Sequence, residues 1–419
     1  MTGIGSLLGE VADDAKLYDV VETALRGGRR RRRVRHAMIG GGAFLAVLAV
    51  AAGVAAPQLY RNGAPVPPVA PPPKVPTACD VQVLPSPAGA LPTEVTGADR
   101  TGRFIVGRSV DEKSDDRQVI VWDDGVPISV AVPGRNQSFT DINSQGEAVG
   151  FSFNDVGGAS YHYADGVLTR LAGDGAGRAT YATAINEAGV IAGAVDIEQD
   201  ATGPTPGTSQ DGSVPQSQGW PVVWRSASAE PIVLPLPAGS VYGIAMGIDE
   251  DSTVAGTVAF DDGDPLSALT QAVVWRPDGT MVPLTEPVLV DGQPATATMA
   301  RGIRDGWVFG SATRAPDSVA FLWNVRTGEV RVRGPVGTIV ADRNGHGWMA
   351  EVRAINARTP GYESIGVLVA GATSLELPRP LGSAGPRQMS VVSISDVGTV
   401  LAGTDFSGSP SVAVRWTCH

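Results

Sequence analysis

The stretch FTDINSQGEAVGFSFNDVGGASYHYADGVLTRL, residues 139–171, shows the pattern that decides the fold of this chain. Apolar and polar residues alternate in a first segment that ends at Asn143 and in a second that follows Gly146. A third segment runs from the glycine-rich turn at Gly157 to the turn at Gly166, and a fourth runs from there to Leu171. These four segments have the two-residue period of half-buried strands. Asn can close a tight turn with its own side chain, and Gly accepts positive φ. The stretch therefore predicts a four-stranded antiparallel meander.

The first hairpin of this unit recurs seven times along the chain. In each copy an apolar residue and a second, usually polar, residue precede a turn that normally contains Gly. The copies begin at Ala98-Asp99, Ile142-Asn143, Ile185-Asn186, Ile248-Asp249, Ile303-Arg304, Ala341-Asp342 and Ile394-Ser395. The sixth copy is assigned with Gly345 as its turn glycine, and the fourth has Ser252 where Gly is expected.

The third strand of the unit is marked by an apolar run that ends in an aromatic residue. These residues are Trp122, Tyr163, Trp224, Trp275, Trp323 and Trp416, and the sixth copy has GVLVAG from Gly366 instead. One aromatic residue per repeat on a buried strand indicates a core anchor rather than a sugar-stacking platform. The copies share residues 79–419, so a unit averages about 49 residues, which suits a propeller blade. We predict an all-β fold, a seven-bladed β-propeller of four-stranded antiparallel blades.

The two ends of the repeat region complete one another. Residues 80–85 resemble the fourth strand of the other units but have no first three strands before them, whereas the last unit stops after its third strand at Trp416. If both ends share one blade, the ring closes and no strand edge is left open. Cys79 and Cys418, the only cysteines, then become neighbours and are predicted to form a disulfide outside the cytoplasm. Two unpaired thiols are the alternative.

The repeat also carries a resemblance to a known family. Its pattern of Ile, then Asn or Asp, then glycines three and seven positions later, followed by a strand ending in Val-Val-Trp, resembles the HAF-type repeat of bacterial extracellular proteins. The match is strongest in the units that contain Asn143, Asn186, Asp249 and Ser395, and weakest in the sixth. The resemblance implies a repeated β architecture at the cell surface. Such repeats have no agreed chemistry and imply no catalytic residues.

Residues 1–36 are predicted to be a cytosolic segment. Apolar residues between 13 and 26 fall on one face of a helix, which would contact a cytosolic partner or the membrane surface, or would serve as a lead-in without a partner. Seven arginines follow within residues 26–35. Beside a long apolar run they are explained by the positive-inside rule rather than by nucleic-acid binding.

The apolar run itself predicts a single transmembrane helix over residues 37–57. Residues 37–56 contain no charge, and about 20 residues suffice to cross the lipid bilayer. The alternative is a signal peptide cleaved near Ala51, but the 36 preceding residues are long for such a leader. The chain is therefore expected to be a single-pass protein of the cell membrane, with its N-terminus in the cytoplasm and residues 79–419 outside.

Residues 58–78 are predicted to be a Pro-rich stalk. The sequence APVPPVAPPPKVP, residues 64–76, cannot form a helix or a sheet ladder and should span roughly 40 Å as a polyproline-like segment. The whole chain has a net charge of −11 despite its run of arginines, so the acidic excess lies in the repeat region. This balance excludes nucleic acid as a partner and favours solubility outside the cell, with a cationic partner as the alternative.

The sequence contains no recognised catalytic, cofactor-binding or metal-binding motif. The histidines, His36, His162, His346 and His419, do not form a metal-ligand pattern, and there is no nucleophile elbow or P-loop. The run of carboxylates between Asp261 and Asp264 resembles a calcium loop but lacks the later Glu of an EF-hand. Residues 198–219 read as a loop insertion between two strands, poor in hydrophobic residues.

Two functions from different classes fit these observations. The first is a membrane-anchored extracytoplasmic binding or scaffold protein whose propeller recognises a protein, a peptide or a cell-wall glycan, and which signals through the cytosolic helix. The second is a cell-surface enzyme such as a glycosidase or lyase, which would need carboxylates converging on the propeller axis. The polar positions of the seven hairpins differ from copy to copy and favour the first.

Overall fold

The computed structural model describes residues 74–87, 92–109, 117–154, 157–173, 178–196, 219–260, 269–289, 291–315, 317–355, 363–383 and 385–419. The predicted helices at 13–26 and 37–57 and most of the stalk lie outside these ranges, as do the calcium candidate at 261–264 and residues 198–218 of the insertion. Within the described ranges, no helix is both long and apolar enough to cross a bilayer.

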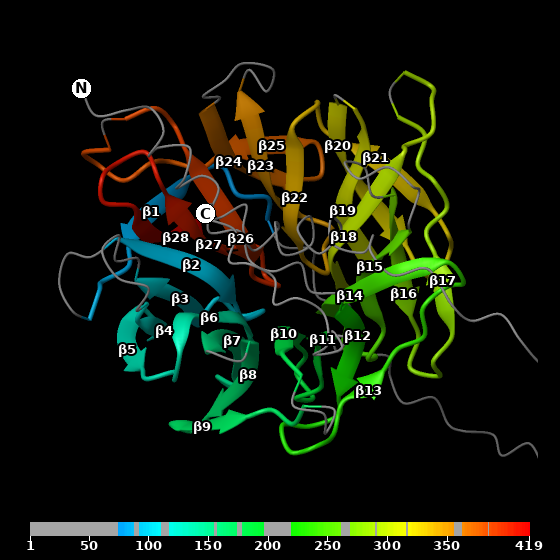
Figure 1. Cartoon of the computed structure of the whole chain (residues 1–419). Helices are drawn as coiled ribbons and strands as arrows, with labels where there is room; N and C mark the ends of the chain where they lie inside the picture. The colour runs from blue at the N-terminus through cyan, green and yellow to red at the C-terminus, as the bar shows by residue number, and fades with distance from the viewer. Residues whose placement is uncertain are drawn as a thin grey trace, which may run out of the picture.

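The described residues form seven four-stranded antiparallel sheets, which confirms the predicted propeller (Figure 1). Blades 1 to 6 each use four consecutive strands, with the first strand innermost. Blade 1 has β2 (Thr93–Ala98), β3 (Phe104–Ser109), β4 (Val119–Asp123) and β5 (Val126–Val130); blade 2 has β6 (Arg135–Ile142), β7 (Ala148–Asn154), β8 (Gly157–Ala164) and β9 (Val167–Arg170); blade 3 has β10 (Thr180–Ile185), β11 (Ile191–Asp196), β12 (Gly219–Trp224) and β13 (Ile232–Val233). Blade 4 has β14 (Ser240–Ile248), β15 (Val254–Phe260), β16 (Leu269–Trp275) and β17 (Met281–Pro283); blade 5 has β18 (Ala297–Arg304), β19 (Trp307–Arg314), β20 (Asp317–Asn324) and β21 (Val330–Arg333); blade 6 has β22 (Thr338–Arg343), β23 (Met349–Ile355), β24 (Glu363–Ala370) and β25 (Thr373–Glu376).

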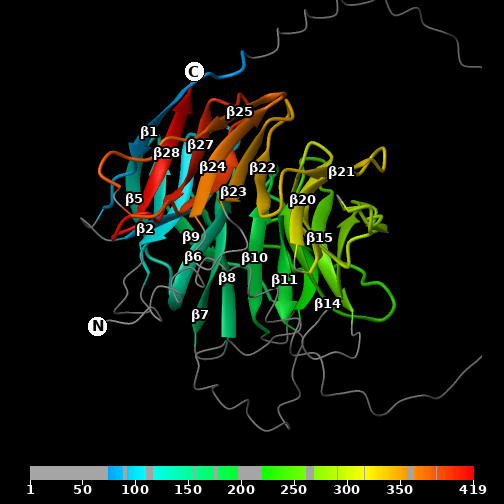
Figure 2. The ribbon, with the colours of Figure 1, turned by 90° about the horizontal axis from the view of Figure 1, so that it is seen from above.

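Blade 7 is built from both ends of the repeat region, as predicted. It contains β26 (Met389–Ile394), β27 (Val400–Asp405) and β28 (Val412–Cys418), and its outermost strand is β1 (Cys79–Val83). Strand β1 pairs antiparallel with β28, with Cys79 opposite Cys418. In Figure 2 the blue segment that leads into β1 lies beside the C-terminus. The ring is therefore closed within one sheet.

The hydrophobic core lies between adjacent blades. One cluster, for example, joins Leu84 and Ala413 of blade 7 to Val95 and Trp122 of blade 1. Trp122, Trp224, Trp275 and Trp416 are fully buried, which confirms them as core anchors. Each indole N–H also donates to a backbone carbonyl at the end of the previous blade's outer strand, in the pairs Trp122–Pro85, Trp224–Ala172, Trp275–Pro235 and Trp416–Pro378. These residues thus bury apolar area and join neighbouring blades.

One hairpin was assigned wrongly from the sequence. In blade 6 the turn is formed by Asn344 and Gly347, not by Asp342 and Gly345: the Gly347 N–H donates to the Asn344 carbonyl, and Asn344 Oδ1 accepts from the N–H of Trp348. Gly347 has the positive φ of 78° that the turn requires. Asp342 with Gly345 and Asn344 with Gly347 both have the spacing of the repeat in the sequence. Asn344 forms the turn because its side chain accepts the N–H of Trp348, just before the next strand.

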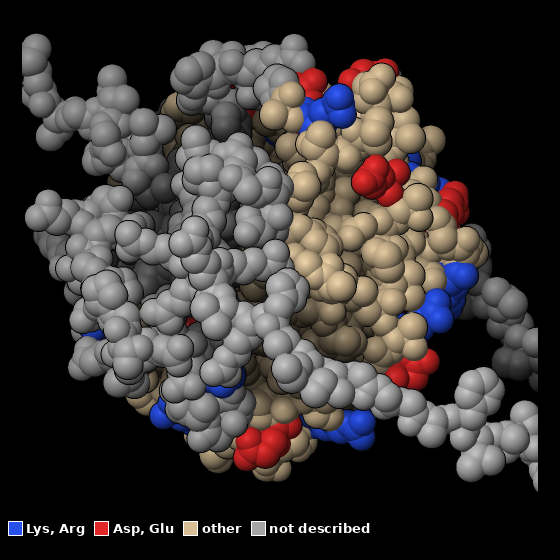
Figure 3. Space-filling view, turned by 45° about the vertical axis from the view of Figure 1, so that its right-hand side comes forward, with Lys and Arg blue, Asp and Glu red and all other residues tan. Residues whose placement is uncertain are grey.

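Charged groups are dispersed on the outside of the propeller. On the face shown in Figure 3, separate blue and red groups lie on and around a largely uncharged area. Among the residues drawn in colour there, no basic patch of the kind that binds nucleic acid is present.

Candidate functional site

The innermost strand of every blade contains a β-bulge at the same position. The pairing with the second strand skips one residue in each blade: Thr96, Thr140, Thr183, Met246, Arg301, Ala341 and Val392. All seven skipped residues line the central cavity and are partly exposed. A bulge redirects a side chain that a regular strand would place differently. The seven bulges therefore determine which side chains face the axis.

A repeated glycine makes room for the bulge. In six blades the second strand has Gly beside it, and an added Cβ would lie 2.0–2.1 Å from a first-strand carbonyl oxygen. These residues are Gly107, Gly150, Gly193, Gly256, Gly310 and Gly403, and blade 6 has Glu351 instead. The same glycines belong to the repeat from which the propeller was predicted. A glycine inside a strand signals a bulge or a close backbone approach, so the sequence contains a signal for the bulges in these six blades.

The cavity along the axis has a volume of about 270 Å³. At one end of the ring, which we call the hairpin end, lie the turns between the first and second strands of the blades. At the opposite end, which we call the far end, the second strands end and the third strands begin. By the same topology, the described chain ends that flank residues 197–218 lie at the far end.

Ion pairs close the cavity at the hairpin end. Arg100 of blade 1 pairs with Glu250 of blade 4 at 2.8 Å, and with Asp305 of blade 5 and Asp396 of blade 7, both at 3.1 Å. A side chain that joins blade 1 to blades 4, 5 and 7 has to cross the axis. Burial alone would lower the pKa of Arg100, but the carboxylates of Asp396, Asp305 and Glu250 raise it above its ordinary value. Arg100 is therefore charged at every physiological pH.

A second arginine reinforces this closure. Arg304 of blade 5 is buried and pairs with Asp342 of blade 6 at 2.8 Å and with Asp396 of blade 7. It also donates to the carbonyl of Ile394 at 2.8 Å. We call Arg100, Arg304 and their four carboxylate partners the plug. Because the plug joins five of the seven blades, it fixes the inner strands relative to one another at this end.

Two carboxylates occupy equivalent places on opposite parts of the ring. Asp141 in blade 2 and Asp342 in blade 6 each directly follow a bulge. Each accepts from the N–H of the next residue with one oxygen, and with the other from a backbone N–H of the next blade: Ile185 for Asp141 at 2.9 Å and Ile394 for Asp342 at 3.0 Å. Both therefore join adjacent blades through a carboxylate-to-amide contact.

The electrostatic surroundings of these two groups differ. Burial raises the pKa of Asp141 to about 7, against the opposing effect of its two amide contacts. The negative charge of Asp342 raises the pKa of Asp141 further, and Arg304 lowers it only weakly. Burial also raises the pKa of Asp342, but Arg304 in direct contact opposes it. Asp141 is thus the channel carboxylate with the weaker charge compensation.

The polar hairpin positions singled out in the sequence mostly serve the ring itself. The Asn143 amide donates to the carbonyl of Asn186, and the Asn186 amide donates to the carbonyl of Asp249. Asp249 in turn accepts from the N–H groups of Asp305 and Gly306. Asp99 and Ser395 instead accept from N–H groups of their own hairpins. At the hairpin end these side chains thus form a series of hydrogen bonds, several of which join neighbouring blades.

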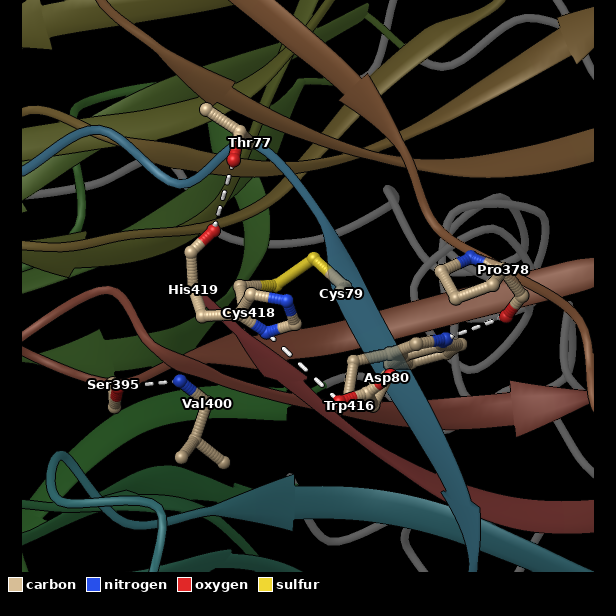
Figure 4. The surroundings of a disulfide bond; sticks show 9 residues. All are labelled: Thr77, Cys79, Asp80, Pro378, Ser395, Val400, Trp416, Cys418 and His419. Carbon is tan, nitrogen blue, oxygen red and sulfur yellow. Dashed lines mark hydrogen bonds and ion pairs between the residues drawn. A yellow bond between two sulfur atoms is a disulfide. The ribbon is translucent and has the colours of Figure 1, made fainter.

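The closure of blade 7 lies at the same end, and Figure 4 shows it. A disulfide joins Cys79 to Cys418, as predicted. Immediately before it, the N–H groups of Thr77 and Ala78 donate to the carbonyl of His419, at 2.7 and 3.2 Å, and the His419 N–H donates back to Ala78. Third strands run toward the hairpin end, and the Cys418 N–H donates to Thr399 in the blade 7 hairpin region. The chain therefore enters the propeller at the plugged end.

Within the described ranges, no group of three or more His, Cys, Asp or Glu side chains is arranged to hold a metal ion. His162 lies 3.9 Å from Glu147. Burial lowers the pKa of His162 and outweighs the attraction of that carboxylate, so its imidazole is neutral at pH 7.

A likeness to a solved structure with a TM-score above 0.5 supports the fold. The chain is similar to a mutant of puromycin hydrolase solved in complex with PGG, with a TM-score of 0.51 and 13% identity over 76% of this chain and 50% of that one. It therefore spans half the length of that hydrolase. It is also similar to the β-propeller domain of the Trilobed protease from Pyrococcus furiosus, with a TM-score of 0.43 and 11% identity over 69% of this chain and 84% of that one. Oligogalacturonate lyase in complex with manganese gives a TM-score of 0.46 and 13% identity over 83% and 98% of the two chains.

At these identities the similarity concerns the fold alone. No protein-family model matches the chain, and no curated protein matches its sequence. The resemblance to HAF-type repeats and the membrane anchor therefore stay predictions.

Proposed function

We propose that this chain is a membrane-anchored extracytoplasmic binding protein that directs the far end of its propeller away from the membrane. The observation that carries the proposal is where the chain enters the ring: Thr77, Cys79 and the C-terminal residue His419 all lie together at the plugged end. A membrane helix at residues 37–57 followed by the stalk would hold that end toward the bilayer. The cavity would then face outward, where a ligand arrives.

The disulfide supports the extracytoplasmic part of the proposal. Disulfides form and persist in oxidising compartments and are rare in the cytosol. Connections between strands also carry most binding functions on rigid scaffolds. Successive blades are joined at the far end, for example by residues 131–134 between β5 and β6, whereas the hairpin end holds the plug.

The enzyme alternative lacks a comparable observation. A glycosidase needs two carboxyl groups on either side of the bond that it breaks. Asp141 and Asp342 both bind backbone amides of the next blade, and Asp342 also binds Arg304. These contacts favour a structural use of Asp342 and leave binding as the better-supported function.

Labelling of intact cells tests the proposal. An azide-bearing phenylalanine analogue is placed at Leu381, which is fully exposed at the far end, or at Val397, which is 55% exposed at the hairpin end. A third variant carries it at Ser6 in the N-terminal segment as the cytosolic control. We expect a membrane-impermeant alkyne dye to label Leu381 in intact cells, and Ser6 only after permeabilisation.

Orientation is read from the size dependence of labelling. An alkyne attached to an antibody fragment should react with Leu381 several-fold faster than with Val397, because the membrane hinders the plugged end. Labelling of Leu381 only after permeabilisation would show that the propeller is not exported. Equal rates with the large reagent at both positions would contradict the outward-facing cavity.

A further inference from the structure

The charges that line the cavity are not balanced. Its carboxylates are Asp141, Glu187, Asp249, Glu250 and Asp342, and its guanidinium groups are Arg100, Arg301 and Arg304. Arg100 pairs with Glu250, and Arg304 pairs with Asp342. With five carboxylates against three guanidinium groups the lining carries an excess of negative charge, to which Asp141 of blade 2 and Glu187 of blade 3 contribute.

Asp141 keeps hydrogen-bonding capacity toward the cavity. Its Oδ1 accepts from the N–H of Ile142 and its Oδ2 from the N–H of Ile185, both at 2.9 Å. Each carboxylate oxygen has two lone pairs, so each can accept one further hydrogen bond. Asp141 is partly open to the cavity, and among the described residues no Lys, Arg or His is within ion-pair distance of it. The ionised form of a carboxyl group that has little access to solvent and no cation beside it is costly, so a cation that reaches Asp141 favours this form.

The surroundings of Asp141 define the size of that cation. The hydroxyl groups of Thr140 and Thr183 donate to backbone carbonyls of the next blade, so they do not occupy the carboxylate. Phe151 and Tyr181 line the same side of the cavity and offer apolar contact to a short alkyl chain. A volume of about 270 Å³ is just below the range of drug-sized pockets, roughly 300–1,000 Å³. The space suits one small group rather than an extended ligand.

We propose that the cavity binds an alkylammonium group that enters from the far end, with Asp141 as its counter-ion. The group could belong to a free amine or to the lysine or N-terminus of a peptide, since the chemistry recognised is the same. The inference deepens the proposed function by naming the ligand class. It accounts for the difference between Asp141, which has no cationic partner among the described residues, and Asp342, which has Arg304.

Proton release makes the proposal measurable. With a pKa of about 7, Asp141 is mostly protonated at pH 6 and mostly ionised at pH 8, so its ionised fraction rises about tenfold between them. The other charges that line the cavity are carried by Glu187, Asp249, Glu250, Asp342, Arg100, Arg301 and Arg304. Binding of an ammonium ion stabilises the ionised form of Asp141. The ligand should therefore displace a proton at pH 6 and almost none at pH 8.

Titration calorimetry on the full chain in detergent micelles tests this inference with n-butylamine. Measurements at pH 6 and pH 8, each in two buffers of different ionisation enthalpy, give the affinity and the number of protons released. We expect about tenfold tighter binding at pH 8, close to one proton released per amine at pH 6, and no binding of butan-1-ol. A lysine-containing tripeptide and its Nε-acetylated form distinguish a peptide ligand from a free amine.

Asp141→Asn should weaken binding of butylamine at pH 8 by at least tenfold. The matched control is Asp405→Asn, which removes a buried carboxylate that also accepts a backbone N–H but lies outside the cavity, and which should leave the affinity unchanged. If Asp141→Asn fails to fold, the proton count of the unmodified chain decides. Absence of butylamine binding, equal binding of butan-1-ol, or binding without proton release at pH 6 would each overturn the inference. None of these results affects the labelling of Leu381 and Val397, which tests export and orientation independently.

Discussion

Blade 2 and blade 6 place the same residue at the same point of the ring and give it different surroundings. Asp141 and Asp342 both follow a bulge and both accept the N–H of the next residue and an N–H of the next blade. Arg304 then binds Asp342 directly, whereas Asp141 faces the cavity without a cationic partner among the described residues. An aspartate at this position therefore joins adjacent blades in both cases. Whether its charge is neutralised inside the protein depends on whether a neighbouring blade supplies an arginine.

The largest effect is expected from removal of the cation that distinguishes the two blades. Arg304→Met leaves Asp342 buried without its partner and removes contacts to Asp396 and Ile394. Loss of one member of a buried pair costs about 3–5 kcal/mol. Chemical denaturation of the full chain should show this loss. The control is Arg387→Met, which breaks the exposed pair with Glu376 and should cost no more than about 1 kcal/mol.

Neutralising each aspartate in turn sharpens the comparison. Asp342→Asn should cost about 1.5–3 kcal/mol, because it removes a hydrogen bond to a charged group. For Asp141 the cost of the same change depends on pH. Its native pKa of about 7 lies above the unfolded value of about 3.9, so its stabilising contribution is complete below about pH 4 and is lost as pH rises through 7.

The wild-type chain should therefore lose stability relative to Asp141→Asn between pH 5 and pH 8. Unfolding curves of both proteins across this range measure the difference. A constant difference would show that the native pKa of Asp141 is not raised above its unfolded value, because a carboxyl group with an ordinary or lowered pKa is ionised in both states throughout this range.

The smallest effect concerns the bulge beside this carboxylate. The hydroxyl of Thr183 lies within hydrogen-bond distance of two carbonyl oxygens, that of Ala192 at 3.1 Å and that of Ala245 at 2.8 Å, and its one hydrogen can be shared between them. Thr183→Val should cost about 1 kcal/mol in thermal unfolding, since blade 7 accommodates Val392 at the same bulge position. Thr373→Val on an exposed outer strand is the control. A loss well above that value would mean that blade 3 depends on its bulge hydroxyl more than blade 7 does.

The ring and its closure could be predicted because their signals are local and repeated. Each hairpin combines a residue that closes the turn with a glycine, and the Cys79 and Cys418 positions reveal the shared blade. The bulge residues are harder to recognise, because Thr, Met, Arg, Ala and Val at this position share no chemistry. Only the glycine opposite the bulge is constant, in six blades.

The site itself depends on contacts that no sequence spacing describes. Arg100 reaches blades 4, 5 and 7 across the axis, and Arg304 reaches blade 7 past blade 6. In the sequence Arg304 replaces the usual Asn or Asp of the hairpin, which marks it as a departure from the repeat but does not indicate its partners. Asp342 was found in the sequence but assigned to the turn instead of the strand before it.

The place of the disulfide also has a mechanical consequence. Cys79 is the first residue of β1, so traction exerted through the preceding chain meets the hydrogen bonds of Thr77 and Ala78 and then a covalent bond to β28. The ladder between β1 and β28 is thereby shielded from tension, and shear is passed to the central strands of blade 7. In the oxidised protein, force applied to the chain before Cys79 therefore cannot separate β1 from β28.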